Sequence, residues 1–439
     1  MKKVLVLSYH FPPFGGAGVQ RPTRMVRYLR EFGYEPAVVT GPAASSGRWT
    51  PADRTLLDEV PTGLAVHRVS QPEPAGSDGG DRKERWLGIR SPWSRWWIRG
   101  AVETGRAAGR DVDLVYAWMQ PYQSAEAGAR LAAALGKPWV ADLGDPWALD
   151  EMIAWPSRWH ARAARRKMGL VLSSAGAIVM STPEAARRVR SDIRQLETHD
   201  VLSVPNGYEP SDFDVPADPR PEGTFRIVHT GYLHTDLGRQ YERFGLARAA
   251  LGGRRNDVDV LTRSHVYLLQ AVEALRREGR PRANEIEVHF AGVLSAEDRK
   301  VLEPYDYVRM HGYLEHPEAV ALMKSADLLF LPMHDLPPGT RATIVPGKTY
   351  DYLGAGRPIL AAVPDGDARD LLLRVGGALV CRPRDAGGMA EAIAGLLAAG
   401  GSAQAPDPAV VQEFAYERLA RQLADVFDRV LARGGTSRA

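Results

Sequence analysis

The sequence predicts an α/β protein with two doubly wound parallel sheets, one in each half of the chain. Three observations predict it. The length of 439 residues exceeds what one hydrophobic core usually organises, so two domains of about 200 residues each are expected. Short apolar runs alternate with helical patterns along the chain, as in parallel βαβ units. A segment rich in Pro, Asp, Glu and Gly divides the runs into two sets.

Six apolar runs predict the strands of an N-terminal domain over residues 1–207. These runs are residues 4–8, 37–40, 114–118, 139–142, 177–181 and 202–204. The polar stretches 41–62 and 71–83 are rich in Gly, Ser and Pro, so we expect loops there.

Residues 208–223 lie in the turn-forming segment and predict the linker between the domains. Six further runs predict the strands of a C-terminal domain over 224–407. These runs are residues 226–230, 287–291, 308–312, 328–332, 358–362 and 378–381. The basic, Gly-interrupted stretch between residues 234 and 261 predicts an insertion. Because ligands bind beyond the carboxyl ends of such strands, we expect the substrates between the two sheets.

An amphipathic helical pattern begins at Pro408 and predicts a C-terminal helix over 408–439 that crosses back toward the N-terminal domain. Its apolar positions are Val411, Phe414, Leu419, Leu423, Val426 and Phe427.

Composition limits the classes of partner. Lys and Arg number 56 against 53 Asp and Glu, for a formal charge of +3, which is too small for a broad nucleic-acid-binding surface. The single Cys381 excludes an intrachain disulfide and fits a reducing compartment. No stretch approaches the ~18 apolar residues of a membrane-spanning helix. The sequence therefore predicts a cytoplasmic protein without a nucleic-acid partner.

The first strand is followed by a glycine-rich segment, FPPFGGAG, over residues 11–18. Gly15, Gly16 and Gly18 let the backbone approach a phosphate or a sugar, and the following helix offers free N–H groups. The spacing differs from the dinucleotide-binding fingerprint. The alternative is an ordinary turn between a strand and a helix.

Asp145 lies in the sequence DLGDPW at the carboxyl end of a predicted strand. A carboxylate in this position can act as a base, stabilise charge or accept a hydrogen bond from a hydroxyl group. Helix capping ahead of Pro146 is the alternative, and both roles can coexist.

The most specific segment is RATIVPGKTYDYLGAGRP, residues 341–358. Here a Pro-Gly loop opens a short helix at Lys348, whose ammonium and neighbouring N–H groups predict a diphosphate site. Asp351 can accept hydrogen bonds from ribose hydroxyls, and its alternative role is to compensate the helix dipole. The donor site that we predict from this segment comprises Thr343, Val345, Pro346, Gly347, Lys348, Thr349 and Asp351.

Together, FPPFGGAGVQR, DLGDPW, VPNGYEPSDF, HTGYL and GKTYDYLGAGRPIL resemble the retaining GT-B glycosyltransferases of the large bacterial family 4, over nearly the whole chain. The resemblance implies two Rossmann-like domains, with the acceptor on the N-terminal side. It also implies that the C-terminal domain binds a UDP- or GDP-linked sugar.

The resemblance also assigns roles to individual residues. It places Gly15, Gly16 and Gly18 against the donor diphosphate and the acceptor, and Gly231 of HTGYL beside the donor. It implies a basic pair near the start of the C-terminal domain that neutralises the diphosphate. We take Arg239 for this role, with Arg254 and Arg255 as competitors. The catalytic residues that we predict are Asp145 and Lys348.

Two positions depart from the family pattern. In the family's motif of two glutamates, the second matches Asp351, while the first falls on Thr343. Gly144 stands where one branch, with the pattern DFRDPW, has arginine. Recognition of the transferred sugar is therefore expected to differ.

The arginine-rich segment 85–100 contains Trp86, Trp93, Trp96 and Trp97, a composition also found in interfacial membrane anchors. We favour packing of these tryptophans on the first domain and expect at most peripheral membrane contact. His10, His229 and His234 have no metal-binding spacing, so no metal is expected.

We conclude that the sequence predicts a metal-independent hexosyltransferase-like enzyme that uses no cofactor. It moves sugar from a nucleoside diphosphate sugar to a small-molecule, lipid-linked or polysaccharide acceptor in a biosynthetic reaction. Retention of anomeric configuration is implied by the resemblance. The alternatives are a GT-B sugar-nucleotide epimerase and a non-catalytic sugar-nucleotide-binding protein.

Overall fold

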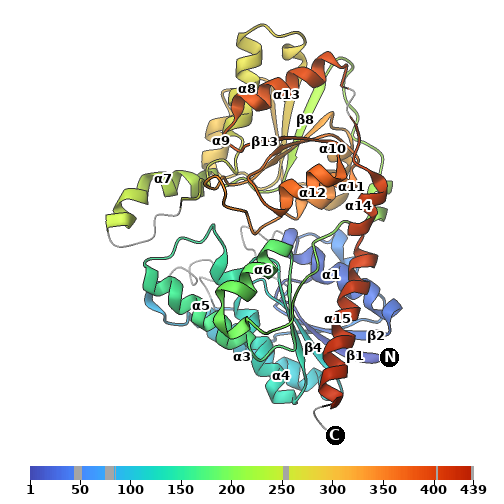
Figure 1. Ribbon diagram of the computed structural model, residues 1–439. Helices are drawn as coiled ribbons and strands as arrows, with labels where there is room; N and C mark the ends of the chain where they lie inside the picture. Colours follow the sequence, from blue (N-terminus) through green and yellow to red (C-terminus); the bar gives the residue numbers. More distant parts are fainter. Residues whose placement is uncertain (44–51, 75–83, 85, 251–256, 402–403, 437–439) are drawn as a thin grey trace. The chain divides into compact units, whose positions relative to one another are not determined.

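The computed structural model describes residues 1–43, 52–74, 84, 86–250, 257–401 and 404–436, and the chain forms two compact units (Figure 1). The first unit contains Met1–Asn206 and Tyr416–Ala439, and the second contains Gly207–Ala250 and Arg255–Ala415. Each unit is built on one parallel sheet. The predicted α/β fold with two doubly wound sheets is confirmed.

The first unit has a seven-stranded sheet in the order β3-β2-β1-β4-β5-β6-β7. Its strands are β1 Lys2–Leu7, β2 Tyr34–Thr40, β3 Ala65–Arg68, β4 Leu114–Trp118, β5 Trp139–Leu143, β6 Ala177–Met180 and β7 Val201–Ser203. The strand order reverses between β1 and β4. The carboxyl ends of these two central strands are therefore the expected place for a ligand.

The helices of the first unit follow the alternation that the sequence predicts. The α-helices are α1 Ala17–Leu29, α3 Pro92–Ala108, α4 Gln123–Leu135, α5 Arg158–Leu172, α6 Pro183–Asp192 and α15 Tyr416–Thr436. The short 3-10 helices are η1 Arg30–Phe32, η2 Thr55–Leu57, η4 Trp147–Leu149 and η5 Arg194–Leu196. The side chains of Ser91, Ser157 and Thr182 cap three of the α-helices by accepting a hydrogen bond from a backbone N–H of the first turn.

Alternate residues of β1 face opposite sides of the sheet, so the first unit has a core on each face. Leu5 and Leu7 pack in the core with Trp97 of α3. Val4 and Val6 pack in the other core with α15 residues, including Leu419, Leu423 and Phe427. The end of the chain thus completes the first unit and packs against α1.

The second unit has a six-stranded sheet in the order β10-β9-β8-β11-β12-β13. Its strands are β8 Phe225–Thr230, β9 Ile286–Ala291, β10 Val308–Gly312, β11 Leu328–Pro332, β12 Ile359–Ala362 and β13 Ala378–Cys381. Its α-helices are α7 Thr235–Ala250, α8 Val266–Arg277, α9 Ala296–Leu302, α10 His316–Lys324, α11 Lys348–Gly354, α12 Asp367–Val375, α13 Ala386–Ala398 and α14 Pro408–Val411. The 3-10 helices are η6 Pro210–Asp214, η7 Ala283–Glu285 and η8 Gln412–Phe414. The order reverses between β8 and β11.

Differences from the sequence prediction lie at the edges. Strand β3 was not predicted, because its AVHR sequence is short and its side chains are half-exposed beside a single partner strand. The stretch predicted as an insertion contains α7. The predicted C-terminal helix is interrupted: α14 and η8 precede the long α15, and the chain at Ala415 is extended.

The tryptophans of segment 85–100 divide into two groups. Trp93 and Trp97 lie one helical turn apart on α3 and are buried against the first sheet, as predicted. Trp96 is partly buried. The prediction is wrong for Trp86, which lies before α3 and is 50% exposed, because the segment there leaves the sheet. Among the described residues, no helix is long and apolar enough to cross a membrane.

A buried ion pair joins α1 to β5 in the first unit. Arg21 is 1% exposed and donates to both carboxylate oxygens of Asp142, at 3.0 and 3.3 Å. It also donates to the carbonyl oxygens of Val204 and Pro205, and the hydroxyl of Tyr116 donates to Asp142 at 2.5 Å. The carboxylate of Asp142 therefore has a structural role. The other carboxylate of DLGDPW, Asp145, is the one that we consider for catalysis.

We predict that Asp142→Asn lowers the free energy of unfolding of the first unit by about 3–5 kcal/mol, because the Arg21 cation then stays buried without its counter-charge. Asp145→Asn is the matched control, three positions away, and should change stability little. Denaturant unfolding followed by tryptophan fluorescence measures both. Equal stability of the two variants would contradict this role of the ion pair.

Candidate functional site

The glycine-rich loop of the first unit lies where the strand order reverses. Gly16 has φ of +90°, a conformation that glycine adopts without strain. A Cβ added to Gly18 would lie 2.6 Å from Oε1 of Gln120, so a side chain at this position would displace the Gln120 amide. The indole of Trp118 donates to the Gly18 carbonyl at 3.0 Å. Gly15 is buried beside them, and the loop is thereby held against the end of β4.

Gln120 connects this loop to Asp145. Its Nε2 donates to Oδ2 of Asp145 at 3.3 Å. Gly18, Gln120 and Asp145 follow β1, β4 and β5 respectively, so the residues predicted from two separate motifs meet at one end of the sheet. Sequence analysis did not identify Gln120, because a lone glutamine carries no recognisable pattern.

His10 lies at the same end of the first sheet. Burial lowers its pKa to about 4, so the imidazole is neutral at physiological pH. Its Nδ1 has no hydrogen-bond partner among the described residues, and its Cδ2 is 3.8 Å from the Cβ position of Gly18. His10 can therefore donate or accept one hydrogen bond beside the glycine loop.

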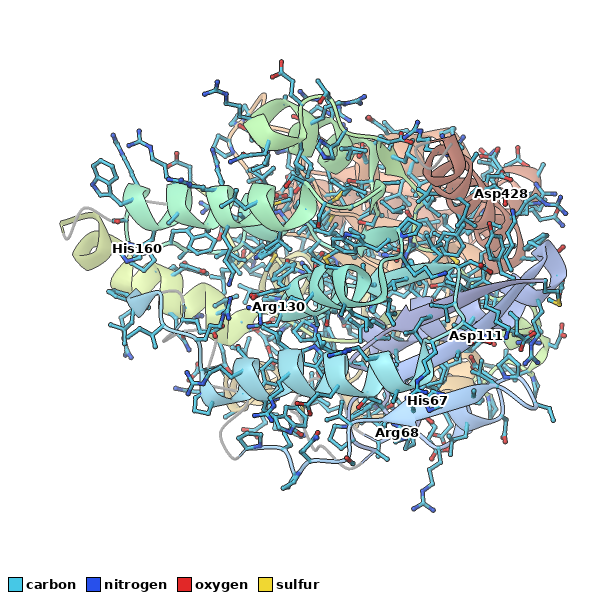
Figure 2. The ribbon with its side chains drawn as sticks, turned by 90° about the horizontal axis from the view of Figure 1, so that it is seen from below. His67, Arg68, Asp111, Arg130, His160 and Asp428 are labelled. Carbon is cyan, nitrogen blue, oxygen red and sulfur yellow. The ribbon has the colours of Figure 1, made fainter. Side chains whose placement is uncertain are left out.

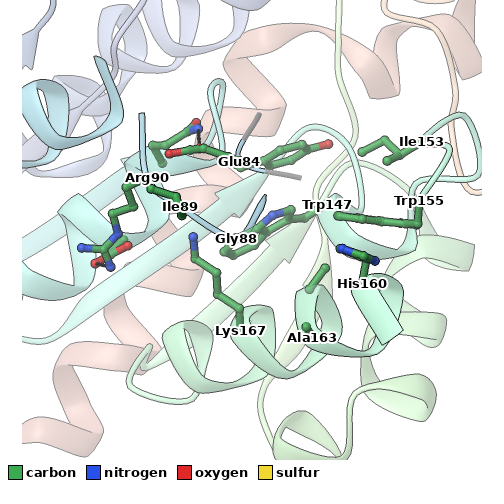
Figure 3. A pocket seen from close by; sticks show the side chains of 14 residues that line it. Glu84, Gly88, Ile89, Arg90, Trp147, Ile153, Trp155, His160, Ala163 and Lys167 are labelled. Carbon is green, nitrogen blue, oxygen red and sulfur yellow. Dashed lines mark hydrogen bonds and ion pairs between the residues drawn. The ribbon is translucent and has the colours of Figure 1, made fainter. Parts of the chain in front are cut away.

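A cavity of about 320 Å³ is lined by Trp147, which follows Asp145 by two positions (Figure 3). The residues that line it are Glu84, Gly88, Ile89, Arg90, Tyr122, Gln123, Glu126, Trp147, Ile153, Trp155, His160, Ala163, Ala164 and Lys167. Trp147 stacks on Tyr122 with ring centroids 5.7 Å apart. Its φ of +45° is unusual for a bulky residue and indicates local strain, which is common at functional sites. The volume suits a small ligand.

In the second unit, Lys348 lies at the carboxyl end of β8. Its Nζ is 2.9 Å from the position of a Cβ added to Gly231, whose φ is +96°. The absence of a side chain at Gly231 thus makes room for the ammonium group. Gly231 follows β8, and Lys348 opens α11. The structure brings together two residues that are 117 positions apart (348 − 231) and that sequence analysis assigned to the donor.

His229 is the hydrogen-bond partner of Lys348. Its Nδ1 lies 2.9 Å from the carbonyl oxygen of Phe330, which can only accept, so Nδ1 carries the proton. Nε2 therefore accepts from Nζ of Lys348 at 3.1 Å. Sequence analysis considered His229 only as a metal ligand and missed this contact.

Burial sets the charge state of this pair. It lowers the pKa of Lys348 well below its usual value, the positive charge of Arg263 lowers it further, and Asp351 opposes the shift. Burial, followed by the charge of Lys348, also lowers the pKa of His229 well below its usual value. The positive charges of Lys348 and Arg263 therefore repel each other beside a neutral imidazole, and a bound anion would reduce that repulsion.

The remaining predicted donor residues line the approach to α11. Thr343, Val345 and Pro346 are buried, and Gly347 is partly exposed. The hydroxyl of Thr349 is buried and has no hydrogen-bond partner among the described residues.

The backbone at the start of α11 contributes less than the sequence suggested. The N–H groups of Thr349 and Tyr350 already donate to the carbonyl oxygens of Pro346 and Gly347. Side chains are therefore the main groups here for binding an anion.

The arginine beside Lys348 is Arg263, which precedes α8 and which sequence analysis did not select. Arg239 lies on α7, is half-exposed and forms an ion pair with Glu242 at 3.7 Å. Its charge acts on His265. The competitors Arg254 and Arg255 lie outside the described residues. Over the described part of the chain, no cluster of three His, Cys, Asp or Glu residues could hold a metal.

Comparisons with known proteins identify both halves of the chain. Residues 15–207 match the family described as Glycosyl transferase 4-like domain. Residues 260–399 match the family described as Glycosyl transferases group 1. The comparison with curated proteins found no match.

Solved structures with the same fold extend over nearly the whole chain. HepE of Anabaena, solved in complex with UDP and glucose, has a TM-score of 0.58 at 15% identity, covering 98% of this chain and 100% of that one. Sucrose-phosphate synthase from Thermosynechococcus elongatus has a TM-score of 0.60 at 14% identity, covering 100% and 98%. The α,α-trehalose 6-phosphate synthase from Burkholderia multivorans has a TM-score of 0.59 at 14% identity, covering 100% and 98%.

The Lys348 site predicts that binding of a nucleoside diphosphate takes up a proton. The pKa of Lys348 is lowered in the free protein, and a neighbouring diphosphate raises it. Affinity should therefore fall as pH rises between the two pKa values, by up to about tenfold per pH unit. Calorimetry in two buffers of different ionisation enthalpy measures the uptake. Identical heats in both buffers throughout the neutral and alkaline range would contradict it.

A second prediction concerns Gly231→Ala, which places a methyl group 2.9 Å from Nζ of Lys348. We expect nucleotide affinity to fall at least about tenfold, because the ammonium group is displaced. Gly279→Ala is the matched control, since Gly279 also has a positive φ, +64°, but nothing lies within 4 Å of its Cβ position. If both variants lose affinity equally, the cause is backbone strain at a glycine with positive φ and not displacement of the Lys348 ammonium group.

Proposed function

Because the chain belongs to the glycosyltransferases of the GT-B type, we propose that it transfers a sugar from a nucleoside diphosphate sugar to a hydroxyl group of an acceptor. The observation that carries the proposal is the contact of Lys348 with His229 and Gly231 at the carboxyl end of β8. A half-buried lysine at the reversal of strand order is suited to a diphosphate.

Lys348 stabilises the departing diphosphate in this proposal. Negative charge on the diphosphate grows as the sugar–phosphate bond breaks, so a neighbouring cation contributes more in the transition state than in the ground state. His229, fixed by Phe330, orients the ammonium group. Asp351, near enough to act on the pKa of Lys348, accepts hydrogen bonds from the ribose.

Uridine is the base that we propose for the donor. Support comes from HepE, which was solved with UDP and with UDP-glucose, and from a Burkholderia xenovorans enzyme described as a UDP-forming trehalose-phosphate synthase. These proteins share the fold at 14–15% identity. A guanosine donor is the competing possibility.

We also propose that the reaction retains the anomeric configuration and needs no metal. An oxygen of the leaving phosphate takes the proton from the acceptor hydroxyl, while the new bond forms on the face from which the phosphate departs. Asp145, held by Gln120, binds a sugar or acceptor hydroxyl in the first unit. Basic side chains replace a divalent ion in neutralising the diphosphate.

Incubation with UDP- and GDP-linked sugars tests this function against the two alternatives. Release of the diphosphate that depends on an added acceptor supports the transferase. A free epimerised sugar nucleotide would instead identify an epimerase. Binding without turnover for every donor and acceptor tried would identify a non-catalytic binding protein. Both domain matches are to glycosyltransferases, which favours the first outcome.

The role of Lys348 predicts that Lys348→Met lowers kcat by about 10²- to 10³-fold, the usual effect of removing one group that stabilises developing charge. Lys300→Met, an exposed lysine on α9 of the same unit, is the control and should keep full activity. Activity of the wild type should persist in excess chelator. Loss in chelator that magnesium or manganese restores would refute metal independence.

The role of Asp351 predicts that Asp351→Asn weakens nucleotide binding by roughly 10- to 150-fold, because a charge-assisted hydrogen bond to the ribose is worth about 1.5–3 kcal/mol. Calorimetric titration with the nucleoside diphosphate measures the effect. Unchanged affinity together with a sharply lower melting temperature would show that Asp351 only stabilises α11.

A further inference from the structure

Two segments of the first unit expose large apolar side chains. Trp86, Leu87 and Ile89 are 50%, 65% and 64% exposed, and Trp159 and Leu170 of α5 are 75% and 59% exposed. These are five of the ten strongly exposed large apolar residues in the described part of the chain. Large apolar groups in water are costly, so a concentration of them indicates an interaction surface.

The two segments lie side by side. Nε2 of His160, on α5, is 3.2 Å from the carbonyl oxygen of Trp86. Both segments line the cavity of Figure 3, through Gly88 and Ile89 on one side and Ala163 and Lys167 on the other. Figure 2 shows His160 at the opposite end of the first unit from Asp111 and Asp428. The exposed apolar side chains therefore belong to one surface, which we call the 86–90/α5 face.

The charge of α5 is entirely positive. Its sequence, RWHARAARRKMGLVL, contains five basic residues and no carboxylate. They are Arg158, Arg162, Arg165, Arg166 and Lys167. Exposed helices of soluble proteins usually intersperse both signs, so this pattern favours an anionic partner.

On the exposed side of α5, two arginines lie between two large apolar side chains. Trp159, Arg162, Arg166 and Leu170 are all exposed and follow helical spacing. The guanidinium of Arg162 lies over the Trp159 ring, 5.3 Å from its centroid. Tryptophan, long apolar side chains and arginine on one helix face are the combination that binds the interfacial region of a bilayer.

We propose that the 86–90/α5 face docks the protein on an anionic membrane surface. The aromatic and aliphatic side chains enter the interfacial layer, and the arginines contact lipid phosphates. The cavity is lined by the same segments and would lie at the lipid surface. Resting on the proposed function, this position implies a lipid-linked acceptor, whose polar end is presented to the first unit while its chain stays in the bilayer.

Co-sedimentation of the full chain with vesicles tests the docking. We expect binding to vesicles that contain phosphatidylglycerol and little binding to vesicles of phosphatidylcholine alone, with affinity falling as salt rises. Each arginine near an anionic surface contributes about fivefold in binding. The double charge reversal Arg162→Glu with Arg166→Glu should therefore lower the partition coefficient more than about 25-fold.

Matched variants separate this face from net charge and from folding. Arg418→Glu with Arg429→Glu makes the same charge change at exposed positions of α15, which packs in a different core of the first unit from α5, and should leave vesicle binding nearly unchanged. Trp159→Ala should weaken it severalfold. Absence of binding to anionic vesicles, or an equal loss in both double variants, would overturn the proposal.

Nucleotide binding distinguishes this result from failure of the proposed function. The charge-reversal variant should bind the nucleoside diphosphate as the wild type does, because the Lys348 site is in the other unit. Vesicle binding without any nucleotide binding would refute the donor site and leave the docking face standing. Nucleotide binding without vesicle binding would refute the docking face and leave the donor site standing.

Discussion

The proposed donor site depends on one electrostatic constraint, a half-buried lysine side chain that donates to a neutral histidine. Nζ of Lys348 is held by Nε2 of His229 at 3.1 Å, and the lack of a side chain at Gly231 gives it space. Burial works against its charge, so the free protein keeps this region at a cost in stability. An anion bound beside Lys348 would favour the charged ammonium and recover that free energy, as we propose for a diphosphate.

In the first unit, two neighbouring carboxylates have different roles: Asp142 stabilises the fold, and Asp145 is the candidate for binding a hydroxyl group. Asp142 is fixed by Arg21 and Tyr116 in the core. Asp145, two positions beyond the end of the same strand, is partly exposed, and its carboxylate accepts a hydrogen bond from the amide of Gln120. The strong ion pair holds α1 against β5, so the glycine loop that opens α1 and the carboxylate that follows β5 keep a fixed relation.

Much of the fold could be predicted from the sequence, because parallel strands buried on both faces are continuous apolar runs. Edge strand β3 was not predicted, because it pairs with a strand on one side only and its side chains are half-exposed. In the site, Lys348 and Gly231 lie in recognisable motifs and were predicted to bind the donor. Arg263 lies in no such motif, and His229 opens HTGYL but was given no role in donor binding. Their roles arise from a charge and a hydrogen bond that form only in the folded protein. The exposure of Trp86 was missed for the same reason, because composition alone does not orient a side chain.

The structure of the protein with bound uridine diphosphate tests the central claim most directly. The account predicts that an oxygen of the diphosphate lies within hydrogen-bonding distance of Nζ of Lys348, beside Gly231, with the ribose hydroxyls on the carboxylate of Asp351. A diphosphate bound elsewhere, with Lys348 still donating only to His229, would contradict it.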